Sequence, residues 1–208
     1  MVRMTSILIL AAACLVITAA DAAAQQNRPG FFVTSSGSGS GDLGGLAGAD
    51  QRCQQLAKAT GAGNRTWRAY LSTTGTGSVN ARDRIGMGPW YNTKGVLIAQ
   101  NLAELHTDKA NINNDTALDE QGRQINAQGA PNRHDIPTGS TAAGMATETT
   151  CNNWTSSGEG SAMVGHHDRL TFGKPGSPWN AAHASKGCSA PNLVGTGGAG
   201  LFYCFAAD

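Results

Sequence analysis

The clearest hydrophobic pattern in the chain lies between residues 45 and 72. One face of an expected helix carries the apolar residues Leu46, Ala49, Cys53, Leu56 and Ala57. Gly61 then ends the helix, because glycine enters the left-handed conformation at low cost. From Trp67 to Ser72 apolar and polar residues alternate, as on a half-buried strand. The stretch therefore predicts a helix followed by a strand.

Shorter apolar runs predict further elements. The expected strands are Phe31–Val33, Val96–Ile98, Ala162–Gly165 and Leu201–Phe205. The last of these is apolar on both faces, which is typical of a central strand. Leu102–Leu105 is expected to form one helical turn. Residues 106–143 are polar with few core positions, and such a long loop within a compact domain is usually functional or disordered.

The N-terminus has the three parts of a secretory signal peptide. Arg3 precedes an apolar run from Ile7 to Ile17, and Ala22-Ala23-Ala24 follows as a cleavage site. We therefore expect residues 1–24 to be a signal peptide and residues 25–208 to be a single domain, secreted or periplasmic. The apolar run is too short for a membrane span. The formal net charge of +1 does not indicate a nucleic-acid or membrane binder.

Cysteine usage agrees with export. Cys14 belongs to the expected signal peptide, and a lipid anchor on it is the less favoured alternative. The remaining cysteines are Cys53, Cys151, Cys188 and Cys204. An even number in an exported chain predicts two disulfides, for which three pairings are possible. Zinc held by cysteines is not expected, because no two of them have Cys-x-x-Cys spacing.

These motifs resemble the endostatin family. GLAGADQRCQQLAKATGAGNRTWRAYLS is similar to the opening of endostatin, and to endostatin-like and lectin-like domains of bacterial surface proteins. Later landmarks agree in order: Thr138-Gly139-Ser140 ahead of Gly144, then Cys151-Asn152-Asn153-Trp154, then Cys188 and Cys204. The resemblance extends from about Phe31 to the C-terminus. It implies a C-type lectin-like α+β fold, with two short helices, antiparallel sheets and a long irregular loop region. It also implies the nested pairing Cys53–Cys204 and Cys151–Cys188.

Sugar-binding members of this group hold calcium through a Glu-Pro-Asn or Gln-Pro-Asp loop and a Trp-Asn-Asp strand. In this chain Trp179-Asn180-Ala181 occupies the position of the second motif, and Ala181 replaces its carboxylate. Pro137, at the position of the first motif, has no amide after it. Because calcium requires several oxygen ligands, its usual binding mode is not expected. We predict no cofactor and no metal site.

His166-His167-Asp168 is the densest group of potential ligands in the sequence. Adjacent residues on a strand point to opposite faces, so the two histidines would not share a metal ion there. A solvated loop is the favoured interpretation and a metal site the alternative. An enzyme is not expected, because the cysteines are assigned to disulfides and no Gly-x-Ser-x-Gly motif is present. A hydrolytic enzyme is the third and least favoured hypothesis.

The aromatic residues suggest where a ligand would bind. Trp67 and Trp154 lie beside cysteines and are expected to pack in the core. Loop aromatics with neighbouring amides suit the apolar faces and hydroxyls of sugars, although a protein partner or packing under loops fits equally well. The candidate ligand-binding residues are Trp179, Asn180, Trp90, Tyr91 and Asn92.

The sequence as a whole predicts an exported, monomeric, lectin-like binding module with a glycan as its ligand. The alternative is an endostatin-type adhesion module that binds an extracellular protein.

Overall fold

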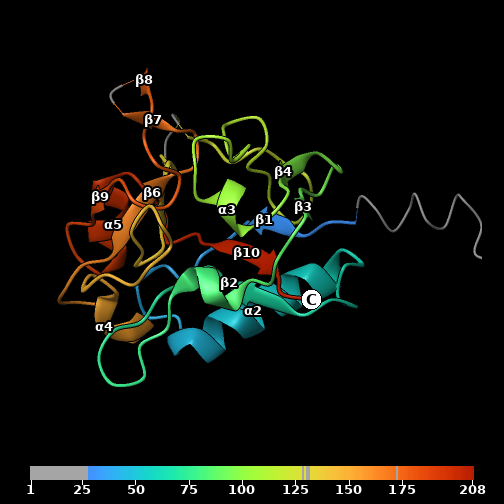
Figure 1. The fold of residues 1–208 in the computed structure, drawn as a ribbon. Coiled ribbons are helices and arrows are strands. Elements are labelled where there is room, and N and C mark those ends of the chain that lie inside the picture. Colours follow the sequence, from blue (N-terminus) through green and yellow to red (C-terminus); the bar gives the residue numbers. More distant parts are fainter. Residues whose placement is uncertain (1–27, 128, 130–131, 172) are drawn as a thin grey trace, which may run out of the picture.

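The computed structural model describes residues 28–127, 129, 132–171 and 173–208. The expected signal peptide, residues 1–24, lies outside this range. The described chain forms short helices and small antiparallel sheets, which confirms the α+β class (Figure 1). None of the helices within these ranges is long and apolar enough to cross a membrane.

A three-stranded antiparallel sheet lies at the centre of the fold. Its strand order is β1 (Phe31–Val33), β10 (Tyr203–Ala206) and β2 (Trp67–Ala69). The closing strand β10 is thus central, as its apolar pattern predicted. Successive side chains on these strands point to opposite faces, so Phe205 joins one core and Cys204 joins the other.

One core lies between this sheet and α2 (Gly45–Ala59), which lies below the sheet in Figure 1. The predicted helix is confirmed, and it buries Ala49, Cys53 and Ala57. Cys53 is bonded to Cys204, which ties α2 to β10.

The second disulfide, Cys151–Cys188, joins α4 (Cys151–Trp154) to the segment before α5 (Ala190–Thr196). Both pairings implied by the family resemblance are therefore present. Trp67 and Trp154 are buried in the core beside these bonds, as predicted.

The other core lies on the opposite face of the central sheet. It is covered by η1 (Ala81–Arg84), the hairpin of β3 (Trp90–Tyr91) and β4 (Leu97–Ala99), and α3 (Leu102–Leu105). The loop that follows was predicted to hold few core residues, and this is wrong. It contributes the buried apolar residues Ala110, Ile112, Ala117, Leu118 and Ile125.

A second antiparallel sheet, of order β5-β6-β9, carries the site described below. It consists of β5 (Asp135–Pro137), β6 (Met163–His166) and β9 (His183–Ala184). A hairpin of β7 (Leu170–Thr171) and β8 (Lys174–Pro175) follows β6 and projects from the top of the molecule in Figure 1.

Candidate functional site

The two loop tryptophans named as candidate ligand-binding residues are buried, as the alternative of packing under loops requires. Trp179 is 2% exposed and Trp90 is 1% exposed. The ring of Trp179 packs against Tyr70 and Tyr203, and its Nε1 donates to the carbonyl of Leu105. Neither ring has a free face for a sugar, because tertiary packing under the long loops takes up both.

The side-chain amides of Asn92 and Asn180 are hydrogen-bonded within the protein. Asn92 is buried, accepts from the backbone N–H groups of Lys94 and Val96, and thereby closes the β3–β4 turn. Asn180 is buried and donates to the hydroxyl of Tyr70. Tyr91 is half-buried. Four of the five candidate residues, Trp90, Asn92, Trp179 and Asn180, are thus buried within the scaffold.

The histidines lie in a different arrangement. The pairing of β5 with β6 places Asp135 opposite His166, and the pairing of β6 with β9 places His183 opposite Val164. Residues two apart on a strand share a face, so His183 lies diagonally across from His166. One face of the sheet therefore presents Asp135, His166 and His183 together.

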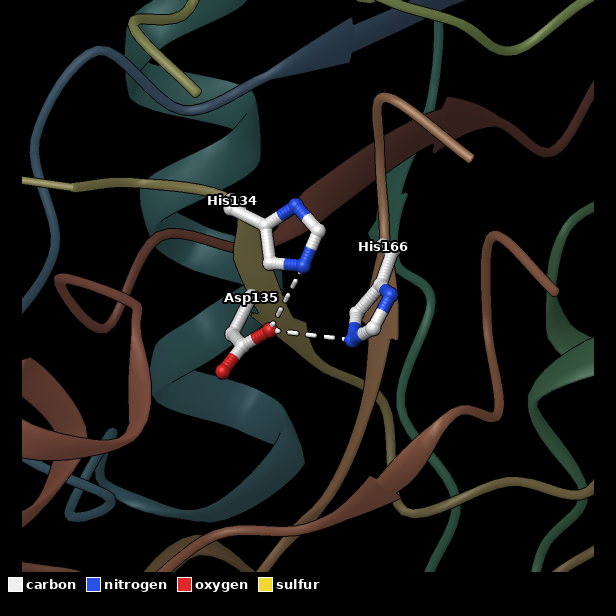
Figure 2. Close-up of side chains that lie close together, drawn as sticks. All are labelled: His134, Asp135 and His166. Atoms are coloured by element: carbon white, nitrogen blue, oxygen red, sulfur yellow. Dashed lines mark ion pairs between the residues drawn. The ribbon is translucent and has the colours of Figure 1, made fainter. Parts of the chain in front are cut away.

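His134 joins this group from the turn just before β5. The side-chain oxygen of Asn132 accepts from the backbone N–H of His134, which forms a local turn. The chain is not yet in strand conformation there, so His134 and Asp135 converge although they are adjacent in sequence. Figure 2 shows a ring nitrogen of His134 and one of His166 that both face the same oxygen of the Asp135 carboxylate. We call His134, Asp135, His166 and His183 the His–Asp cluster.

The imidazole Nε2 atoms converge on one carboxylate oxygen. Asp135 Oδ1 lies 3.5 Å from Nε2 of His134, 3.3 Å from that of His166 and 3.7 Å from that of His183. The Nε2 atoms of His166 and His183 are 3.0 Å apart. Asp135 is 2% exposed, and neither of its oxygens has a hydrogen-bond partner among the described residues. A buried carboxylate without a hydrogen bond is costly and uncommon.

The other ring nitrogen of each histidine is held by an acceptor. Nδ1 of His134 lies 2.8 Å from a carboxylate oxygen of Asp168. Nδ1 of His166 lies 2.5 Å from the carbonyl of Leu170, and that of His183 lies 3.2 Å from the carbonyl of Ala184. Carbonyls and carboxylates only accept, so each Nδ1 carries a proton. In the neutral rings, each Nε2 then presents a lone pair to Asp135.

Burial and neighbouring charge perturb these groups strongly. Burial raises the pKa of Asp135 to about 6, against the opposing charges of His183 and His134. Burial, with the charge of His134, lowers the pKa of His166 to about 4. Burial also works to lower the pKa of His134, but its hydrogen bond to Asp168 outweighs this and raises it. His166 is therefore neutral at pH 7 and offers its lone pair.

A pocket of about 420 Å³ opens over the cluster. Its polar lining, which defines the Asp135 pocket, includes Asn132, His134, Asp135, His166, Thr171 and His183. The side chain of His183 is 45% exposed, which gives access from solvent.

The solvated loop expected for His166-His167-Asp168 is wrong, because all three residues are buried. The two histidines do diverge, as the strand argument required, since only His166 belongs to the cluster. The ring nitrogens of His167 have no hydrogen-bond partner among the described residues, and burial lowers its pKa to about 4. The partners of His166 lie across strands and are remote in sequence, so its neighbours along the chain do not reveal the cluster. The recurrence of His-Asp at 134–135 and 167–168 was the available signal.

No protein-family model matches the chain, and no curated protein matches its sequence.

Proposed function

We propose that the protein is an exported, lectin-like binding module that takes a polar extracellular ligand, with a glycan as first choice, in the Asp135 pocket. The lectin-like assignment draws support from the nested disulfides, which join the cysteines that the resemblance pairs. Disulfides form and persist in oxidising compartments, which supports export.

The main support for this proposal is the set of polar side chains that line the Asp135 pocket. Imidazole, carboxylate, hydroxyl and amide groups face one concave surface, and together they offer both donors and acceptors. Ligand pockets use a few such groups to fix the orientation of a ligand. The pairing of β5 and β9 with β6 gives these groups a fixed sheet as their support. The proposed site therefore differs from the one that the sequence suggested, since it replaces tryptophan stacking with hydrogen bonding.

A glycan array with a blocked pocket tests this proposal. Thr171 is exposed at the pocket rim, so Thr171→Phe fills the opening without entering the core. Thr107→Phe is the matched control, because Thr107 is also exposed but does not line the pocket.

We expect the wild type and Thr107→Phe to bind the same glycans and Thr171→Phe to lose them. Equal binding by all three proteins would place the site elsewhere. If no glycan binds while an extracellular protein does, the endostatin-type adhesion module is the better account.

A further inference from the structure

We propose that His134, Asp135, His166 and His183 form a binding site for a divalent transition-metal ion of the zinc type. This goes beyond the proposed function, because metal binding at the cluster requires no glycan. It also departs from the expectation of a metal-free protein.

The first argument is electrostatic. His134, Asp135 and His166 each offer a ligand atom within 4.8 Å of the other two, and Nε2 of His183 lies 3.0 Å from Nε2 of His166 and 3.7 Å from Oδ1 of Asp135. Four electron-rich atoms that face one another repel, and burial of Asp135 removes the water that would otherwise screen them. A cation at the centre of the group would remove this repulsion. Oδ1 of Asp135, which has no hydrogen-bond partner among the described residues, would be one of its ligands.

The second argument is geometric. The ligands of a tetrahedral zinc ion lie about 2.0–2.1 Å from the metal, so neighbouring ligand atoms are about 3.3–3.4 Å apart. Four of the six separations in such a tetrahedron are 3.0, 3.3, 3.5 and 3.7 Å, which lie on both sides of this value.

The third argument concerns the groups behind the ligands. A histidine that binds zinc usually donates its other ring N–H to a carboxylate or a backbone carbonyl, which fixes the tautomer and the orientation of the ring. His134 does so to Asp168, and His166 does so to Leu170. These contacts leave both Nε2 atoms available to a metal ion.

Ligand chemistry selects the metal. Neutral imidazole nitrogens suit zinc and its neighbours, whereas calcium and magnesium prefer oxygen ligands. The cysteines are absent from the site because both pairs are bonded as disulfides. The expected centre has three nitrogens and one oxygen.

Zinc titration of the full exported chain, without a histidine tag and after treatment with a chelator, tests the proposal. We expect one zinc ion per chain and, with cobalt as a probe, the visible absorption of a tetrahedral ion. His134→Gln, His166→Gln, His183→Gln and Asp135→Asn should each lower zinc affinity by more than about 100-fold, since loss of an outer-shell partner alone costs 10–100-fold. Asp168→Asn should lower zinc affinity by about 10–100-fold, because Asp168 contacts Nδ1 of His134 and is not itself a ligand.

His106→Gln is the matched control. It removes the histidine that is bonded to Tyr70 and Leu102, outside the cluster, and should retain wild-type affinity. Circular dichroism of the metal-free variants separates lost ligands from lost folding. Absence of zinc binding by the folded wild type would overturn the proposal and indicate that a proton bridges the cluster. Wild-type affinity in His183→Gln would contradict the four-ligand centre. Neither result depends on glycan binding, so failure of this proposal is distinct from failure of the proposed function.

Discussion

Asp50 on α2 and Asp135 at the start of β5 are both buried carboxylates, with exposed fractions of 8% and 2%. Asp50 accepts from the guanidinium groups of Arg68 and Arg84 and from the backbone N–H of Ala69. The two guanidinium groups balance its charge, and both of its carboxylate oxygens accept hydrogen bonds. Asp135 has no such hydrogen bonds and faces imidazole lone pairs.

This difference in hydrogen bonding distinguishes the scaffold around Asp50 from the candidate site around Asp135. In the region of α2, each polar group of Asp50 contributes to holding the helix against the central sheet. In the β5-β6-β9 sheet, the carboxylate of Asp135 is buried without a hydrogen bond from the described residues, an arrangement that is costly for folding. Perturbed, poorly compensated groups of this kind concentrate at functional sites.

The largest expected effect is at the scaffold disulfide. The Cys53–Cys204 bond spans a sequence separation of 151 residues. Replacing both cysteines with alanine should lower the free energy of unfolding by about 5 kcal/mol in the chain-entropy model. Urea unfolding measures this loss. Zinc affinity of the folded fraction should be unchanged, because the bond lies outside the His–Asp cluster; a parallel loss of zinc affinity would show that the two regions are coupled.

Asp50→Asn should be nearly as damaging. It leaves Arg84, whose side chain is 9% exposed, without its charged partner, and breaking a buried ion pair typically costs about 3–5 kcal/mol. Urea unfolding at neutral pH again measures the change. A cost below about 1 kcal/mol would place Asp50 among weak surface pairs and remove the contrast with Asp135.

Zinc should stabilise the protein where calcium does not. At a free zinc concentration about 100 times its dissociation constant, the native state gains about 2.7 kcal/mol, or roughly 5–10 °C in melting temperature for a domain of this size. The gain should vanish in Asp135→Asn and persist in His106→Gln. Calcium at the same concentration should leave the melting temperature unchanged, because the cluster offers mainly nitrogen. A rise with calcium alone would indicate an oxygen site elsewhere.

The smallest effect is expected for Asp135→Asn without metal. The amide removes a buried charge, and its N–H groups can donate to the lone pairs of His166 and His183. We expect the metal-free variant to match the wild type or to exceed it by about 1 kcal/mol in free energy of unfolding. A large loss of stability would show that Asp135 serves the scaffold in the way that Asp50 does.

The scaffold was largely predictable from the sequence because its signals are local. The helical spacing around Cys53 and the two-sided apolar pattern of Leu201–Phe205 follow from the periods of helix and strand. The pairing of cysteines was not derivable from their number, and came from the resemblance to endostatin-like domains.

The site was not predictable in the same way. His134, His166 and His183 meet because β6 pairs with β5 on one side and with β9 on the other, and such pairing is long-range. The burial of Trp179 has a similar origin, since its partners Tyr70 and Tyr203 lie on distant parts of the chain. Loop composition around a residue gives no measure of packing by remote segments.

Anomalous diffraction at the zinc absorption edge, from crystals of the zinc-loaded protein, tests the central claim most directly. The account predicts one anomalous peak among the Nε2 atoms of His134, His166 and His183 and Oδ1 of Asp135, about 2.0–2.2 Å from each of these atoms. A peak bound elsewhere, or no peak at the cluster in crystals grown at saturating zinc, would contradict it.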